Sequence, residues 1–155
     1  MRLMSMLALI AVGAATLATP AAAQDEEFHW TGKLAPGQTL EIRGVSGDIR
    51  AARATGSEIR VDARKHGRRS DPASVHIEVV PWDGGVTICA VYPSRDDREN
   101  ECRPGGGHNN TRNNDVSVAW TIQVPDGVNL ETHTVNGDVN VTEIGGDVTA
   151  STVNG

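Results

Sequence analysis

The stretch TVNGDVNVTEIGGDVTASTVNG, residues 134–155, decides the fold of this chain. Thr-Val-Asn-Gly opens and closes it, which sets a period of 18 residues, and the Gly-Gly-Asp at 145–147 lies halfway, which sets a sub-period of nine. A unit this short cannot bury its own apolar stripe, so successive units stack and bury their stripes against one another. The repeat therefore predicts an all-β fold, with a solenoid-like or β-helix-like stack of short strands in 18-residue coils in the C-terminal part.

The rest of the chain alternates apolar and polar residues, as strands with one buried face do. Residues 58–64, 75–79 and 116–124 carry this two-residue period, and turn formers such as Gly and Pro separate the runs. No apolar stripe of helical period is sustained outside the first 23 residues. The signature Val45-Ser-Gly-Asp-Ile49 matches Val135–Val139 at the valine, the glycine and the aspartate, which indicates one architecture for the early and late segments.

The glycines of the repeat have a mechanical interpretation. A corner between short strands often needs a positive φ, which glycine adopts freely. We therefore assign to turns the residues Gly47, Gly137, Gly146 and Gly155. The alternative is calcium, because nonapeptide β-rolls bind this ion and Asp138 and Asp147 lie nine residues apart. One carboxylate per turn supplies too few of the about six to eight oxygens that calcium needs, so we expect no metal site.

The first 23 residues are predicted to be a signal peptide. Arg2 precedes an apolar run, Leu3–Leu17, and Pro20 precedes Ala21–Ala23, a small-residue cleavage site. An N-terminal membrane anchor is the alternative, but the run is short and its end is rich in alanine. The remaining residues, 24–155, fit a single β-repeat domain that is exported to the periplasm, the cell surface or the extracellular space.

The chain is acidic, with 14 Lys and Arg against 20 Asp and Glu and a formal net charge of −6. A nucleic-acid partner would need a basic stripe with interleaved aromatic residues, and aromatic residues make up only 3% of this sequence. We therefore expect no nucleic-acid partner. The core is expected to consist mostly of Val, Ile, Leu and Ala, which suits narrow stacked sheets.

Cys89 and Cys102, the two cysteines of the chain, are predicted to form a disulfide. An even count in an exported protein favours pairing, and the polar segment 94–101 between them has nothing to bury. The bridge would stabilise the fold by about 3 kcal/mol in the chain-entropy account. A redox or metal role is the alternative, but the sequence has no Cys-x-x-Cys and His108 is the only nearby histidine.

The basic cluster of the sequence spans residues 64–69. It could bind an anionic glycan, lipopolysaccharide phosphates or an acidic partner through Arg64, Lys65, Arg68 and Arg69. The alternative is a solvated turn between two strands, because Asp62 and Asp71 flank the cluster and the strand alternation runs into it.

No catalytic motif appears in the sequence. There is no Gly-x-Ser-x-Gly, phosphate-binding loop or His-Glu-x-x-His, and the five histidines stand singly at no metal-ligand spacing. We therefore expect neither an enzyme nor a cofactor. A small exported repeat domain without a site motif is more often a binding or structural module.

Four stretches carry a resemblance to a known family: Gly85–Pro93, Cys102–Gly107, Val124–Val128 and the Thr-Val-Asn-Gly-Asp-Val repeats. Together they resemble the bacterial "putative adhesin" family of domains of unknown function, over roughly residues 45–155. The resemblance implies an envelope-associated β-solenoid whose repeats run on for several more turns, and it implies no catalytic residues. This chain departs from that pattern by stopping at Gly155, in the middle of a repeat.

These observations predict a non-catalytic module of the cell envelope or surface, a structural or adhesin-like scaffold that displays polar loops. The alternative is a periplasmic ligand-binding or envelope-stress-sensing module, and a polysaccharide-active β-helix enzyme ranks third. The residues name no specific ligand or protein partner. Because no capping unit follows the last coil, we expect either a truncated piece of a longer repeat protein or self-association through the open C-terminal edge.

Overall fold

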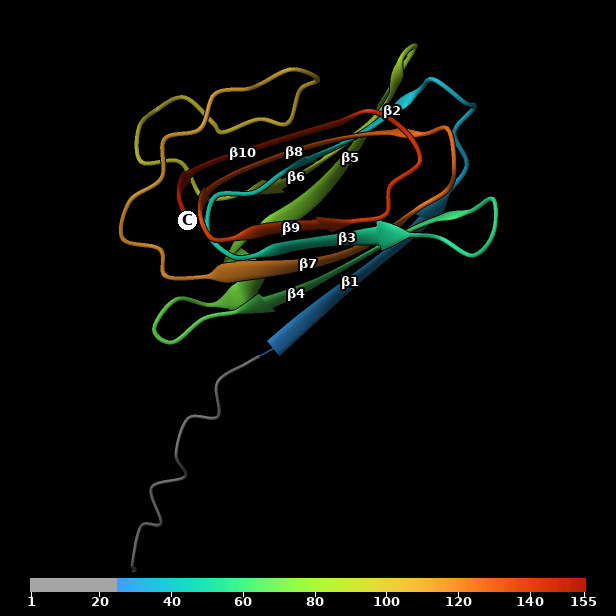
Figure 1. Ribbon diagram of the computed structural model, residues 1–155. Coiled ribbons are helices and arrows are strands. Elements are labelled where there is room, and N and C mark those ends of the chain that lie inside the picture. The colour runs from blue at the N-terminus through green and yellow to red at the C-terminus, as the bar shows by residue number, and fades with distance from the viewer. Residues whose placement is uncertain (1–24) are drawn as a thin grey trace, which may run out of the picture.

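The structure, a computed structural model, describes residues 25–155 (Figure 1). The predicted signal peptide, residues 1–23, lies outside the described residues. The described chain contains β1 (Asp25–Gly32), β2 (Thr39–Arg43), β3 (Ile49–Arg53), β4 (Ile59–His66), the 3-10 helix η1 (Pro72–Ser74), β5 (His76–Trp82), β6 (Gly85–Val91), β7 (Ser117–Val124), β8 (Asn129–Asn136), β9 (Val139–Thr142) and β10 (Val148–Asn154). The predicted all-β fold is confirmed. Within residues 25–155, no helix has the length and apolar character to cross a membrane.

The strands form two five-stranded sheets that enclose a common interior. Sheet A has the order β1-β4-β7-β3-β9, and sheet B has the order β10-β8-β2-β6-β5. The chain steps from sheet B to sheet A between β2 and β3, between β6 and β7, and between β8 and β9. Figure 1 shows these steps as successive turns of the ribbon, with β9 and β10 at one end of the stack.

The strands that carry the repeat pair in parallel and in register. β10 pairs with β8 at an offset of 18 residues, as in Asn136 with Asn154. β3 pairs with β9 at an offset of 90 residues, five such periods, and the same offset joins the corners Asp48 and Asp138. The 18-residue period is therefore the sequence distance between stacked strands, and its half takes the chain from one sheet to the other.

The other end of each sheet departs from a uniform parallel stack. β1 pairs antiparallel with β4, β4 with β7, and β5 with β6, so both sheets are mixed. Apolar alternation is the same in parallel and antiparallel strands, so it predicted strands over 58–64 and 75–79 without predicting their direction.

The interior between the sheets is aliphatic apart from Trp120. The stripe predicted over residues 116–124 lies entirely inside, and each of its apolar members is at most 1% exposed: Val116, Val118, Trp120, Ile122 and Val124. Facing residues of sheet B, such as Leu40 and Ile42, are 0% exposed. Burying an aliphatic side chain of this size stabilises the fold by about 1.5–3 kcal/mol relative to leaving it in water.

Gly47 and Gly137 lie at stacked corners where two constraints exclude a side chain. Their φ values are +118° and +153°, in the region that favours glycine. A Cβ on Gly47 would meet the carbonyl oxygen of Val118, and a Cβ on Gly137 would meet that of Gly47. The positive φ expected at every repeat glycine does not extend to Gly146, where the close approach of the Val128 carbonyl is the only constraint. At Gly155 the backbone of Gly137 makes the same close approach.

Candidate binding surface on the outer face of sheet B

Two parallel strands bring four ionisable side chains together on the outer face of sheet B. β2 and β8 pair in register, so Glu41 lies beside Glu131 and Arg43 lies beside His133. We call these four residues the charged quartet. Within each strand the acid contacts the base two positions on: Arg43 Nη1 donates to Glu41 Oε1 at 2.6 Å, and His133 Nε2 lies 2.7 Å from Glu131 Oε1. Each carboxylate of the quartet therefore has a basic group against it.

Glu41 is the most buried member of the quartet, with a side chain that is 2% exposed. Besides Arg43, its carboxylate accepts hydrogen bonds from the Thr87 hydroxyl at 2.7 Å and from the Gly105 N–H at 3.0 Å. Desolvation is the largest influence on the pKa of Glu41 and raises it, but the hydrogen bonds from Thr87, Arg43 and Gly105 together outweigh it and lower the pKa. Glu41 is thus held ionised, and it ties β2 and β6 to the loop that carries Gly105.

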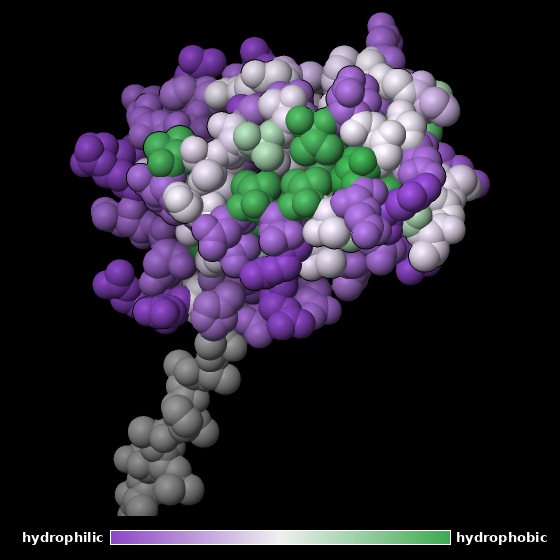
Figure 2. Space-filling model, viewed as in Figure 1, coloured by the Kyte–Doolittle hydropathy of each residue, from purple (hydrophilic) through white to green (hydrophobic). Residues whose placement is uncertain are grey.

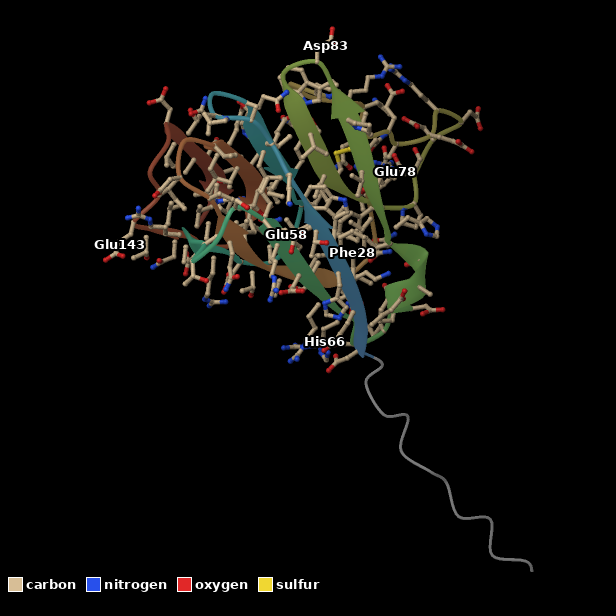
Figure 3. The ribbon with its side chains drawn as sticks, turned by 90° about the vertical axis from the view of Figure 1, so that its right-hand side faces the viewer. Phe28, Glu58, His66, Glu78, Asp83 and Glu143 are labelled. Carbon is tan, nitrogen blue, oxygen red and sulfur yellow. A yellow bond between two sulfur atoms is a disulfide. The ribbon has the colours of Figure 1, made fainter. Side chains whose placement is uncertain are left out.

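The loop of residues 92–116, between β6 and β7, is fastened to sheet B at several points. The Cys89–Cys102 disulfide joins it to β6, with Cα atoms 5.6 Å apart, which confirms the predicted bridge. Figure 3 shows this bridge near Glu78 of β5. At the base of the loop, the Tyr92 hydroxyl donates to the carbonyl oxygen of Val116 at 2.8 Å, and burial raises the pKa of Tyr92 to about 12.

Polar contacts order the interior of the loop. Asn100 Nδ2 donates to the Tyr92 carbonyl at 3.0 Å, and Asn100 Oδ1 accepts from the Asn110 N–H at 2.6 Å. Asp96 accepts from the Asn110 side chain at 2.6 Å and also from Ser94. These hydrogen bonds, that of Asn110 first, hold the pKa of Asp96 at about 2. A segment with few apolar groups is therefore shaped by its amides and carboxylates.

A pocket of about 240 Å³ lies between the loop and sheet B. Its lining includes two members of the quartet and groups from the loop and the rim: Arg43, His133, Glu101, His108, Val135 and Val153. His108 Nε2 is shielded from solvent and has no hydrogen-bond partner among the described residues; Asp96 Oδ1 is 3.7 Å away. The pocket combines one cation, two imidazoles and one carboxylate, which suits a small polar ligand with a negative group.

Three quartet residues are also the one group of potential metal ligands found within residues 25–155. Donor atoms of Glu41, Glu131 and His133 all lie within 4.8 Å of one another. However, both oxygens of Glu41 already accept hydrogen bonds, and a cation would have to displace the Arg43 guanidinium. The geometry therefore favours a charge-paired surface over a metal centre.

The two aspartates of the calcium alternative are not part of that group. They stand at successive corners of the repeat, where their backbone groups bind the coil below. The N–H of Asp138 donates to the Asp48 carboxylate at 3.2 Å, and the N–H of Asp147 donates to Asn129 Oδ1 at 3.0 Å. These contacts give the repeated polar corners a structural role.

The basic cluster does not form one surface. Arg64 and Lys65 are consecutive in β4, so their side chains point to opposite faces. Lys65 is 4% exposed, and its Nζ donates to the Val75 carbonyl at 2.8 Å and lies 3.0 Å from Glu26. Residues 64–66 thus continue the strand, where a solvated turn was the alternative expectation.

The other members of the cluster are exposed. Arg64 lies 3.2 Å from Glu27 on the outer face of sheet A, and Arg69 lies 3.3 Å from Asp115. Arg68 is exposed in the turn after β4. Anion or glycan binding at this cluster stays a prediction, and these three arginines would have to carry it.

Sequence reasoning missed the charged quartet, because Glu41 and Arg43 look like ordinary solvent-facing residues of an amphipathic strand. A signal was present. Leu40-Glu-Ile-Arg43 matches Leu130-Glu-Thr-His133 at the same 90-residue spacing that relates Val45 to Val135. Extending that match upstream predicts that the two carboxylates stack, although it does not predict that a loop covers one of them.

Comparisons with known proteins give one distant likeness. No family model matches the chain, and no curated protein matches it. Among solved structures, it is similar to the crystal structure of a "putative cell adhesion protein" from Clostridium sporogenes ATCC 15579, with 8% sequence identity and a TM-score of 0.41. The match covers 82% of this chain and 58% of that one, so this chain spans little more than half the length of that protein. A likeness of this size assigns neither a family nor a function.

Proposed function

We propose that this protein is a non-catalytic, exported module of the cell envelope or surface, an adhesin-like scaffold that displays a polar loop from a solenoid-like stack. The observation that carries the proposal is the anchoring of the 92–116 loop by a disulfide and by the buried carboxylate of Glu41. A disulfide suits an oxidising compartment outside the cytoplasm. A preordered loop loses little conformational entropy on contact, which favours a display surface.

Membership of the adhesin-like family of domains is part of this proposal. The support is the parallel stacking of β2, β8 and β10 at multiples of 18 residues, which is how a solenoid buries short repeats. The antiparallel strands β1, β4 and β5 would then form the closed end of the stack.

An adhesion assay tests the display role. Beads coated with the purified protein are expected to adhere to surfaces coated with acidic envelope polysaccharide, and the protein is expected to release no reducing sugar from it. Replacing three exposed loop residues with serine, Arg95, Asp97 and Glu99, is expected to reduce adhesion without unfolding the protein. Arg60→Ser on the outer face of sheet A is the matched control. Equal adhesion of the two variants, or release of sugar, would reject the proposal.

The pocket under the loop favours a second candidate, a periplasmic ligand-binding module. Its basic lining from Arg43, His133 and His108 suits a small anionic sugar. Glucuronate added to the protein would then shift the imidazole NMR signals of His133 and His108 but not that of His29 on sheet A. Unchanged signals at millimolar glucuronate would exclude this candidate.

A further inference from the structure

We propose that the end of the stack formed by β9 and β10 is a self-association surface, at which two copies of this chain pair about a two-fold axis. β9 is the outermost strand of sheet A and β10 is the outermost strand of sheet B. All seven residues of β10 are exposed. Both strands therefore present unpaired backbone groups at the same end of the molecule, as Figure 1 shows.

The backbone of β10 offers a regular row of donors and acceptors. The N–H of Leu130 donates to the Asp147 carbonyl, which fixes the parallel ladder between β8 and β10. In such a ladder alternate residues point to the neighbouring strand, so the N–H groups of Val148, Ala150 and Thr152 point away from it. These groups can pair with an added strand without any change to the existing ladder.

The side chains at this end are apolar. Val139, Val141 and Ile144 pack against the core but are only partly buried, and Val148 is 43% exposed. Figure 2 shows apolar residues gathered on the face where β9 and β10 lie in Figure 1. A hollow of about 510 Å³ between the two strands adds room for side chains of a partner. This end is thus core-like surface that nothing in the described chain covers.

The two ends of the stack differ in their protection against strand addition. The outermost strands of the other end carry charges and a proline: β1 reads DEEFHWTG, and β5 reads HIEVVPW. Charge and proline on an edge strand block pairing with another chain. β9 and β10 read VNVT and VTASTVN, with neither charge nor proline. Only the β9/β10 end is therefore built to accept a strand.

The contacts between coils inside the molecule show what kind of partner fits. Asn154 Nδ2 donates to Asn136 Oδ1 at 3.0 Å, and Thr152 lies in register with Thr134. Each coil is thus covered by a strand of similar, uncharged sequence. In a second copy the described strand pair with this property is the same β9/β10 end. A surface that pairs with itself gives a closed two-fold dimer rather than a filament.

Three acidic residues surround the apolar patch at the corners of the last coil: Asp138, Glu143 and Asp147. Two copies brought end to end place these acids near one another, so charge opposes the contact. Added salt reduces the range of that repulsion from about 8 Å at 0.15 M to about 3 Å at 1 M. Salt is therefore expected to tighten the dimer, whereas it would weaken a contact made by ion pairs.

Sedimentation velocity over a range of protein concentrations tests the proposal. The purified protein is expected to show a monomer–dimer equilibrium with no larger species, and the dimer is expected to tighten in salt. Ala150→Lys places two like charges across the axis from an exposed position and is expected to raise the dimer Kd about 10-fold or more. Thr121→Lys adds the same charge on the exposed outer face of sheet A and is expected to leave the Kd unchanged.

Hydrogen exchange supplies a second readout that does not depend on either variant. The amides of Ala150 and Thr152 are expected to become protected as concentration rises. A monomer at every concentration, weaker association in salt, or equal effects of the two lysine variants would overturn the proposal.

Discussion

Replacing Glu41 by glutamine separates the charge of this buried carboxylate from its shape. Glutamine keeps one oxygen that can still accept from Thr87 or Gly105, but Arg43 loses its counter-ion. Hydrogen bonds to charged groups contribute about 1.5–3 kcal/mol each. Because the Arg43 side chain is 27% exposed, water compensates part of its loss. We therefore expect Glu41→Gln to lower the free energy of unfolding by about 2–3 kcal/mol.

The effect of Glu41→Gln should depend on pH with a definite sign. The folded-state pKa of Glu41 is lowered from its ordinary value of 4.5. A group of this kind stabilises the fold above its unfolded pKa, and its contribution is lost as pH falls through the folded pKa. The difference between the variant and the unmodified protein should therefore be full at pH 7 and shrink as the pH falls well below 4.5.

Urea unfolding with the disulfide intact measures this difference, and hydrogen exchange at Gly105 reports whether the loop detaches. Glu131→Gln is the matched control, because Glu131 lies beside Glu41 but its side chain is 37% exposed and contacts only His133 within hydrogen-bond range. Exposed pairs contribute about 0–1 kcal/mol. Equal losses in the two variants, or a Glu41→Gln loss that is the same at pH 3 and pH 7, would refute the anchoring role of Glu41.

Four further outcomes are expected. The double variant Cys89→Ser with Cys102→Ser should lower the free energy of unfolding by about 3 kcal/mol in urea, a loss that reduction of the unmodified protein should reproduce. Gly47→Ala should cost several kcal/mol by the same measurement, whereas Gly56→Ala, where nothing lies within 4 Å of the added Cβ, should cost little. The pKa of His29, raised chiefly by its hydrogen bond to Asp62, should fall toward 6.5 in Asp62→Asn by NMR titration; the pair stabilises below that ordinary value and is lost as pH rises through the folded one. Millimolar calcium should leave the Tm unchanged, because the repeated aspartates act through their backbone groups at structural corners.

The stacking register could be predicted from the sequence because a repeat places the same chemistry at each level. The two Thr-Val-Asn-Gly tetrapeptides pair directly, as Thr134 with Thr152, and the match between Val45 and Val135 reports the pairing of the corners that follow them. Strand direction at the other end could not be predicted in this way. Nothing repeats in β1, β4 and β5, and alternation alone does not distinguish parallel from antiparallel neighbours.

The burial of Glu41 and Lys65 shows where alternation stops being informative. A two-residue period states which side chains share a face, but not whether that face meets water. Glu41 faces outward from β2 and is covered by a loop more than 60 residues later, and Lys65 is held by Val75 and Glu26 at the edge of sheet A. Such covers depend on contacts between distant segments. The sequence feature that remains is the row of stacked positions, and in this chain the row of Thr87, Glu41, Glu131 and Thr149 changes its chemistry from level to level, whereas a purely structural ladder would repeat it. That change, rather than the repeat, marks the strands on which a binding surface has been built.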